Sequence, residues 1–301
     1  MAWEWERVSG PDGFAEGPAW DGNGLFFSVI IRDEIRRYDP VTGRTTTVYR
    51  NTRAANGLLF APDGTLLACE GTGGRAIVRY DRDGQRHVLV DRHDGQRLNS
   101  PNDLALAPDG TIWFTDPRYG DDHSDRELDH DSVYRLDPAA SDGGRTLHRV
   151  TFDTTRPNGI LLSADGGTLY VAQSDYDPGS VRQLRAYPVG PDGMLGAATV
   201  LHDFGEARGI DGMAFDADGN IVAACGWEVS GPGSRVTVFA PDGTVLDESP
   251  LPEARPTNCA FGGEDLTDLY VTATDGGVWR VRGTGRSGLL QPPEERPFTG
   301  A

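Results

Sequence analysis

The chain has 301 residues, with 46 Asp and Glu against 28 basic residues, for a formal net charge of −18 at pH 7. Such an acidic surface repels phosphate backbones and anionic lipid head groups, so we expect no nucleic acid partner and no membrane partner. Every basic residue is arginine, and a chain without lysine cannot form a Schiff base with its substrate.

The chain shows no mark of export or membrane insertion. Residues 1–7 carry neither the basic nor the apolar run of a signal peptide, and no stretch approaches the ~20 apolar residues of a membrane span. Cys69, Cys225 and Cys259 have no metal-type spacing, so we expect buried free thiols in a reducing compartment. The predicted location is therefore cytoplasmic.

The first predicted element is a strand over residues 3–9, where Trp3 and Trp5 alternate with Glu4 and Glu6. A β-hairpin unit follows it and recurs along the chain, most clearly at residues 100–116. There a polar Asn102 precedes an apolar strand at 104–107, a Pro-Asp-Gly turn and a strand at 111–115 rich in β-branched and aromatic residues. The proline presets φ and the glycine allows a positive φ, so the turn is well specified.

Six copies of this unit begin 40 to 56 residues apart. Each copy starts with one polar residue, here called the leading residue, and the six are Glu16, Asn56, Asn102, Asn158, Asp211 and Asn258. Further short strands follow, for example at 35–39, 77–81 and 133–137. Repeats of about 40–50 residues with roughly four short strands are typical of a β-propeller.

We therefore predict an all-β fold, a six-bladed β-propeller that residues 1–301 form as a single domain. Two unrelated β domains would not explain six spaced copies. Because propellers commonly close by pairing strands from the two ends of the chain, we expect residues 3–9 to pair with the last blade near 278–281. The tail from Gly288, with three prolines, is expected to wrap irregularly or to be disordered.

The leading residues are candidates for a metal site. The innermost strand of each propeller blade lines the central channel, so equivalent positions form a ring. Two carboxylates and four amides facing one axis would be costly to bury unpaired, and a cation would remove that cost. Oxygen donors without Cys or His favour Ca²⁺, then Mg²⁺ or Mn²⁺, over structural Zn²⁺. The alternative is that Asn56, Asn158 and Asp211, each followed by glycine, only form turns, and for Asn56 and Asn258 a water-mediated or substrate contact is favoured.

The intervals after Asn102 and Asn158 are the longest, and the excess of the first lies in a polar segment at 116–130 that contains Asp116 and Tyr119. It is either a solvated loop or a rim over a pocket, because long loops in compact folds often serve as lids. Residues 173–178 occupy the corresponding place in the fourth repeat.

The sequence resembles the SMP-30/gluconolactonase/LRE-like family, also called the regucalcin family, over nearly its whole length. The most specific matches are Leu-Asn-Ser-Pro-Asn-Asp at 98–103, Trp-Phe-Thr-Asp-Pro at 113–117, Pro-Asn-Gly-Ile at 157–160 and Gly-Ile-Asp-Gly-Met at 209–213. The resemblance implies a six-bladed propeller and metal-dependent hydrolysis of sugar lactones. It places metal ligands at Glu16, Asn158 and Asp211, and a metal or substrate ligand at Asn102.

One departure concerns the substrate. Animal members carry a substrate-contacting Arg two residues before the Asn that matches Asn102, and this chain has Ser100 there. Their lid Glu has no clear counterpart, although Asp116 lies nearby. We therefore do not expect this chain to share the sugar-acid preference of those members. The predicted substrate-binding residues are Asn102, Asn56, Asp116, Tyr119 and Asn258.

The predicted chemistry is ester hydrolysis in which the metal polarises the lactone carbonyl and stabilises the oxyanion. Asp211 is the candidate catalytic base by resemblance, with a metal-bound water as its rival. The alternatives are a metal-dependent hydrolase of phosphotriesters or of another small metabolite, and a non-catalytic binding propeller. The six histidines do not belong to the ring, and no Ser-His-Asp arrangement is predicted. The oligomeric state is left open.

Overall fold

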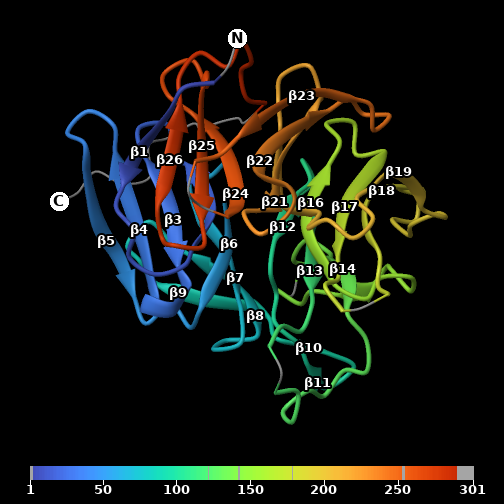
Figure 1. Ribbon diagram of the computed structural model, residues 1–301. Coiled ribbons are helices and arrows are strands. Elements are labelled where there is room, and N and C mark those ends of the chain that lie inside the picture. The colour runs from blue at the N-terminus through green and yellow to red at the C-terminus, as the bar shows by residue number, and fades with distance from the viewer. Residues whose placement is uncertain (1–2, 121, 142, 178, 253–254, 290–301) are drawn as a thin grey trace.

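The computed structural model describes residues 3–120, 122–141, 143–177, 179–252 and 255–289, and almost every regular element in it is an antiparallel strand (Figure 1). Six four-stranded sheets form the blades. The first strand of each sheet contacts the first strand of the next, and β24 contacts β2, which closes the ring. These contacts confirm the all-β, six-bladed prediction.

The first three blades follow one another along the chain. Blade 1 consists of β2 (Ala15–Trp20), β3 (Leu25–Val29), β4 (Glu34–Asp39) and β5 (Arg44–Arg50). Blade 2 consists of β6 (Ala55–Phe60), β7 (Leu66–Glu70), β8 (Ala76–Tyr80) and β9 (Arg86–Val90). Blade 3 consists of β12 (Leu104–Leu106), β13 (Ile112–Asp116), β14 (Ser132–Leu136) and β15 (Leu147–Arg149).

The last three blades complete the circle. Blade 4 consists of β16 (Pro157–Leu162), β17 (Thr168–Ser174), β18 (Arg182–Pro188) and β19 (Thr199–Asp203). Blade 5 consists of β20 (Ile210–Phe215), β21 (Ile221–Trp227), β22 (Ser230–Phe239) and β23 (Val245–Pro250). Blade 6 consists of β24 (Pro256–Gly262), β25 (Asp268–Ala273), β26 (Val278–Val281) and β1 (Trp5–Ser9).

The two ends of the chain meet in blade 6. The strand expected over residues 3–9 is β1, and it runs antiparallel to β26 with Trp5 opposite Val281 and Arg7 opposite Trp279. After β26 the chain crosses back, and Gly288 bridges to Asp216 of blade 5. Residues 290–301, which hold the three prolines of the expected irregular tail, lie outside the described residues.

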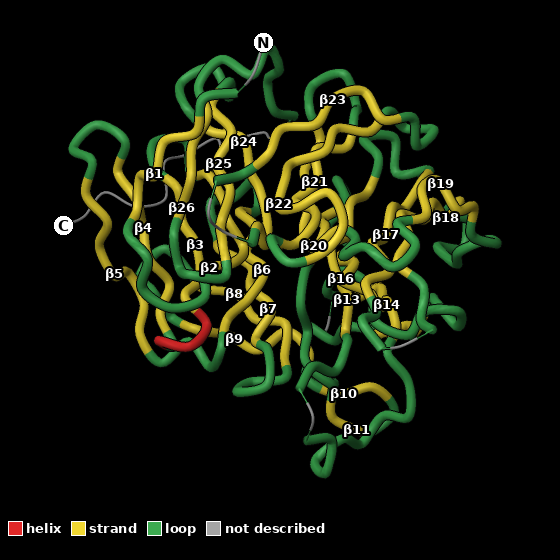
Figure 2. Tube along the Cα trace, viewed as in Figure 1, coloured by secondary structure: helices red, strands yellow, loops and turns green. Residues whose placement is uncertain are grey.

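Two minor elements complete the described part of the chain. A two-stranded ribbon of β10 (Arg92–His93) and β11 (Gln96–Arg97) projects between blades 2 and 3. The single helical element there is the 3-10 turn η1 (Ile30–Arg32), drawn red in Figure 2. No helix in the described ranges has the length and apolar character needed to cross a membrane.

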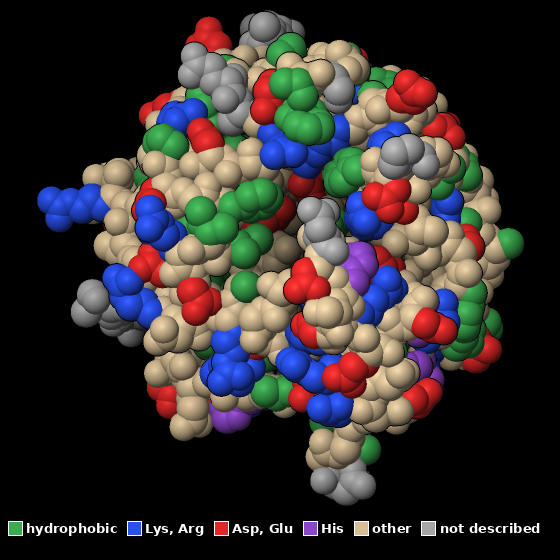
Figure 3. Space-filling model, turned by 60° about the horizontal axis from the view of Figure 1, so that its bottom comes forward, with side chains coloured by type: hydrophobic (Ala, Val, Ile, Leu, Met, Phe, Trp, Pro, Cys, Tyr) green, Lys and Arg blue, Asp and Glu red, His purple; other side chains and the backbone are tan. Residues whose placement is uncertain are grey.

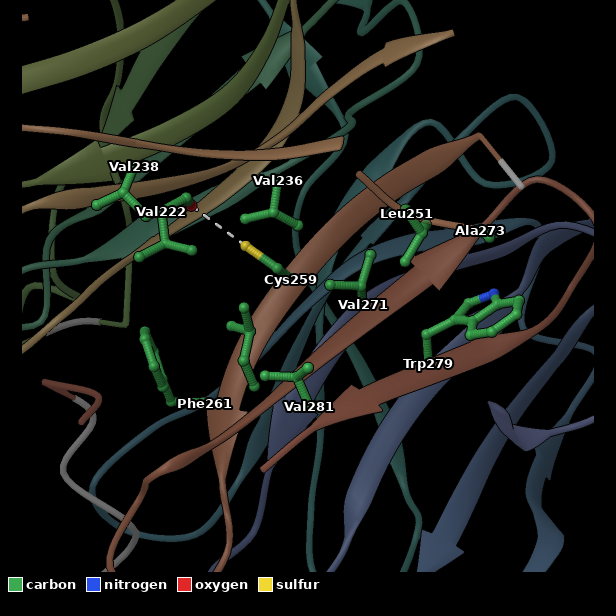
Figure 4. Close-up of a cluster of buried hydrophobic side chains, with 11 residues drawn as sticks. Val222, Val236, Val238, Leu251, Cys259, Phe261, Val271, Ala273, Trp279 and Val281 are labelled. Carbon is green, nitrogen blue, oxygen red and sulfur yellow. Dashed lines mark hydrogen bonds between the residues drawn. The ribbon is translucent and has the colours of Figure 1, made fainter. Parts of the chain in front are cut away.

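The core lies between neighbouring blades, in six separate apolar clusters. Figure 4 shows the cluster between blades 5 and 6, where Val222 and Val238 face Phe261 and Val271. Cys259 lies in the same cluster and its thiol donates to the Val222 carbonyl, with 3.2 Å between sulfur and oxygen. All three cysteines are free and buried, so they pack as small apolar side chains.

Candidate functional site on the propeller axis

Five of the six leading residues line one cavity, with a volume of about 310 Å³, at the centre of the propeller. They are Glu16, Asn56, Asn102, Asn158 and Asp211, which come from blades 1 to 5 in order. Figure 3 shows the hollow near the middle of one face, with acidic side chains at its floor and both apolar and arginine side chains around its rim. Its volume is at the lower end of the ~300–1,000 Å³ usual for pockets that enclose small molecules.

A β-bulge in the inner strand directs several of these side chains into the cavity. In β16, Pro157 pairs with Gln173 and the pairing resumes only at Ile160, so that Asn158 and Gly159 have no partner in β17. Asn56 with Gly57 in β6, and Asp211 with Gly212 in β20, are left out of the pairing in the same way. Bulges of this kind bend a strand and redirect its side chains.

The glycine after the leading residue lets neighbouring blades approach closely. A Cβ on Gly159 would lie 2.4 Å from the Asp211 carbonyl oxygen, and one on Gly57 would lie 2.6 Å from the carbonyl oxygen of Asn102. Both distances are too short for a side chain, so the glycines are required by the convergence of the inner strands. In these two places the Asn-Gly pair is therefore more than a turn signal.

Hydroxyl groups on the second strands fix the spacing between blades. Thr115 of blade 3 donates its Oγ1 to the Asn158 carbonyl at 2.7 Å, and Ser28 of blade 1 donates to the carbonyl of Asn56 at 2.9 Å. Each bond holds the backbone of a leading residue from the preceding blade. The positions of the cavity residues are therefore set by contacts between blades as well as within them.

The cavity contains two buried carboxylates close to each other. Glu16 is 4% exposed and Asp211 is 8% exposed. Burial raises the pKa of Glu16 well above its ordinary value, and the nearby negative charge of Asp211 raises it further. Burial also raises the pKa of Asp211, and the cation Arg208 offsets only part of that rise. Two carboxylates that resist ionisation in this way are a site where a positive charge would be stabilised.

Arg208 anchors one side of this carboxylate pair. Its Nη2 donates to Oδ2 of Asp211, and its Nη1 donates to the carbonyls of Gly226, at 2.7 Å, and Pro256, at 3.0 Å. The side chain is 4% exposed and therefore spans blades 5 and 6 inside the protein. Arg208 thus holds Oδ2 of Asp211, and a side-chain hydrogen bond from Asn158 also reaches this carboxylate.

The donor set fits a hard divalent cation. The Asn56 Oδ1 atom is buried and has no hydrogen-bond partner within the described residues. Asn158 donates its Nδ2 to the hydroxyl of Tyr119 at 2.7 Å. This bond orients the side-chain amide and leaves its Oδ1 atom as a potential ligand. No group of three or more His, Cys, Asp and Glu suited to a metal occurs in the described ranges, so amide oxygens would have to complete the site.

Two predicted substrate-binding residues lie outside the cavity. Asn258 pairs regularly with Thr272, because the irregularity in β24 falls one residue earlier, and its Nδ2 donates to Asp103 Oδ2 at 3.4 Å within the channel. Asp116 is fully buried, and its carboxylate accepts the N–H groups of Asn99 and Ser100, each at 2.8 Å. Asp116 thus holds the segment before Asn102, and Asn258 is a partner of Asp103, so contact of either residue with the substrate stays a prediction.

The segment at 116–130 contributes Tyr119 to the cavity wall and is otherwise tied to the protein. Arg118 forms an ion pair with Asp125, and the Arg75 side chain, buried below the segment, donates to the Asp125 carbonyl at 2.8 Å. Arg126 pairs with Asp131 at 2.6 Å. Of the two interpretations left open, a solvated loop and a rim, the contacts favour the rim.

The cavity residues that were not predicted include Tyr176, Arg208 and Arg255. Arg208 and Arg255 each precede the leading residue of their blade by three positions, at Asp211 and Asn258. This equal spacing could have identified both arginines from the sequence, because residues at the same distance from equivalent positions reach the same end of the channel. Tyr176 belongs to the segment at 173–178 that corresponds to the rim segment of blade 3.

The fold and the site together define a class: a six-bladed propeller with a buried ring of carboxylates and amides at one end of its channel. A match to the SMP-30/Gluconolactonase/LRE-like region spans residues 14–275, which is most of the chain. The chain belongs to this family.

Individual relatives agree with that assignment. The chain is 33% identical over 296 residues to a gluconolactonase of Zymomonas mobilis, covering 89% of this chain and 78% of that one. It is 30% identical over 274 residues to a 6-deoxy-6-sulfogluconolactonase of Pseudomonas putida, covering 89% and 85%. Among solved structures, a gluconolactonase of Xanthomonas campestris superposes with a TM-score of 0.80 at 33% identity, covering 93% and 89%.

Proposed function

We propose that this protein is a cation-dependent hydrolase that opens the ring of a sugar lactone. The observation that carries the proposal is the pair of buried carboxylates, Glu16 and Asp211, surrounded by amides in a cavity on the propeller axis. The gluconolactonases that this chain resembles at 33% identity support sugar lactones as the substrate class.

Glu16, Asp211 and Asn158 would hold the cation, with Asn102 as a further oxygen donor. Ca²⁺ suits this set of carboxylate and amide oxygens best, and Mg²⁺, Mn²⁺ and Zn²⁺ are the alternatives. When bound, a divalent cation supplies Lewis-acid polarisation of the lactone carbonyl.

The chain's own residues supply the remaining steps. Asp211 accepts the proton of the attacking water on its carboxylate, which Arg208 holds in place through Oδ2. Arg208 keeps the carboxylate oriented through its two backbone carbonyl partners. Tyr119 and Asn102 line the wall beside these groups and would orient the hydroxyls of the sugar ring. Attack at the carbonyl carbon gives a tetrahedral intermediate, and its collapse breaks the ring C–O bond. The proton that Asp211 accepted passes to the leaving ring oxygen, so the product is an open-chain hydroxy acid.

A pH-drop assay over a panel of aldonolactones tests the proposal. The purified protein should open at least one lactone faster than the uncatalysed rate, lose that activity in EDTA and regain it with added Ca²⁺, Mg²⁺, Mn²⁺ or Zn²⁺. The panel includes a phosphotriester, because the same oxygen donors could serve phosphorus chemistry.

Two results would contradict the proposal. Undiminished lactone hydrolysis in EDTA, with no cation found in the protein by elemental analysis, would exclude the cation-dependent mechanism. Turnover of the phosphotriester without any lactone would assign the other chemistry.

A further inference from the structure

The arginines around the cavity differ in what they contact. Arg208 is paired with Asp211, and the nearby Arg156 is paired with Asp175 at 3.4 Å. Arg255 lines the cavity, yet it has no ion pair with any residue that the structure describes, and its Nε atom is buried without a hydrogen-bond partner there. Arg255 is near enough to Asp211 to lower the pKa of that carboxyl, but it makes no ion-pair contact with the described residues, so its N–H groups are available to a ligand.

The side chain of Arg255 is nevertheless held in place. Its guanidinium carbon lies 4.7 Å from the ring centroid of Trp227, the last residue of β21 in blade 5. Its own carbonyl accepts the N–H of Thr274 at 3.0 Å. A guanidinium stacked on an aromatic face keeps its N–H edge free for a planar acceptor, and a carboxylate can accept two N–H bonds from that edge.

The charge of the whole cavity favours an anion. Glu16 and Asp211 carry two negative charges when ionised, and Arg208 and Arg255 carry two positive ones. A divalent cation bound by the carboxylates would leave the cavity with net positive charge. Phe14, Ile30 and Ile31 also line the cavity, but their apolar side chains cannot hydrogen-bond an anion, so binding of an anion depends on the charged residues.

From this geometry we propose that Arg255 is a specificity-determining residue that binds an anionic substituent, a carboxylate or a group of like charge, on the lactone substrate. The inference rests on the proposed lactone hydrolysis and narrows its substrate class to acidic sugar lactones. The stacking ring of Trp227 and the N–H of Thr274 position Arg255 for this contact.

A matched pair of substrates tests the inference. Glucono-1,4-lactone and glucaro-1,4-lactone share a ring and differ at C6, which is a hydroxymethyl group in the first and a carboxylate in the second. We expect the cation-loaded wild type to have the higher kcat/KM for the glucaro-lactone. In Arg255→Gln the ratio of the two kcat/KM values should fall about 10- to 100-fold, as expected for loss of a charge-assisted bidentate contact.

A control variant separates this contact from a change of net charge. Arg149 is also stacked on an aromatic ring, that of Phe152, with 4.5 Å from guanidinium carbon to centroid, and it does not line the cavity. Arg149→Gln should keep the wild-type ratio. In the wild type itself the ratio should shrink as ionic strength rises from about 0.05 to 0.5 M, because salt screens partly exposed charges. That measurement does not depend on any variant folding.

The outcomes distinguish the inference from the proposed function. An unchanged ratio in Arg255→Gln, or an equal loss on both lactones, would overturn the role of Arg255 while leaving lactone hydrolysis intact. If the wild type opened neither lactone, the proposed function would fail for this pair. The anion site would then be judged by calorimetric binding of glucarate against gluconate: glucarate should bind about 10-fold more tightly to the wild type, with no such difference in Arg255→Gln. Equal binding of the two acids to the wild type would overturn the site as well.

Discussion

The inner strands of blades 4 and 6 carry the same kind of residue at equivalent repeat positions, Asn158 and Asn258, and place them in different surroundings. In blade 4 a bulge leaves Asn158 out of the ladder, and its side chain lines the cavity. In blade 6 the irregularity comes one residue earlier, Asn258 stays in the ladder, and its side chain meets Asp103 inside the channel. The position of one bulge therefore decides whether an asparagine belongs to the cavity or to the polar contacts in the channel.

The carboxylates differ in the same way. Asp211 lines the cavity beside Glu16, whereas Asp103 is buried in the channel and is bonded to Asn258 and to the Leu104 N–H at 2.9 Å. Channel groups that satisfy one another need no ligand, and cavity groups that repel one another do.

The largest expected effect is on catalysis. Asp211→Asn should lower kcat/KM for a lactone about 10²- to 10⁴-fold, the range for loss of a general base. Asp103→Asn is the matched control, and it should keep kcat/KM within about fivefold of wild type because Asp103 does not line the cavity. Steady-state kinetics with saturating cation measure both. Comparable losses in the two variants would remove the functional distinction between the cavity and the channel.

Cation affinity should separate the two asparagines next. Asn158→Ala removes an oxygen donor, and its cation affinity should fall by about 10-fold or more. Asn258→Ala should bind the cation as the wild type does but unfold at a lower temperature, since it leaves Asp103 without that hydrogen bond. Calorimetric titration with Ca²⁺ and thermal unfolding measure these quantities. Weaker cation binding in Asn258→Ala would place that residue in the cation site after all.

The pH dependence of stability should include a contribution from Asp116, a buried carboxylate that does not line the cavity. Burial raises the pKa of Asp116 to about 7, although the N–H groups of Asn99 and Ser100 act in the opposite direction. Because the folded pKa lies above the unfolded value of about 3.9, the stabilisation is fully present below pH ~4 and is lost as pH rises towards 7. Urea unfolding of the cation-loaded protein should show this decline between pH 5 and pH 8.

The variant Asp116→Asn should show a smaller decline over the same pH interval, because it lacks the titrating group. Asp165→Asn, at an exposed turn, serves as the control and should keep the wild-type slope. A wild-type slope in Asp116→Asn would exclude Asp116 as its source.

The smallest expected effect is on the contacts between blades. Thr115→Val removes the hydroxyl that donates to the Asn158 carbonyl at 2.7 Å, and it should lower the free energy of unfolding by about 1–3 kcal/mol. Another contact between blades, between 6 and 1, joins the Thr257 hydroxyl to the Ala15 carbonyl at 2.7 Å, and Thr257→Val should cost a similar amount. Only Thr115→Val should also weaken cation binding, because it alone releases the backbone of Asn158. Equal cation affinities in the two variants would show that this bond serves stability alone.

The number of blades and the propeller fold followed from the sequence, because turn chemistry and alternating apolar residues are local properties that repeat along the chain. The Pro-Asp-Gly turn at 108–110 and the alternation at residues 3–9 are examples, and both correspond to structure at the expected places. The repeat phase also identified Glu16, Asn56, Asn102, Asn158 and Asp211 as residues that meet at one end of the channel.

Contacts between distant segments decided which of these side chains line the cavity and which are buried elsewhere. Asp116 was expected at the substrate because it is polar and lies near Asn102, yet it is buried against Asn99 and Ser100. Residue type alone does not distinguish Arg255 from the other arginines. Its stacking on Trp227 of the neighbouring blade sets it apart from the arginines that form ion pairs. The physical reason is that local sequence fixes the direction of a strand, whereas the register between strands and the packing between blades fix which side chains share a cavity and which satisfy one another.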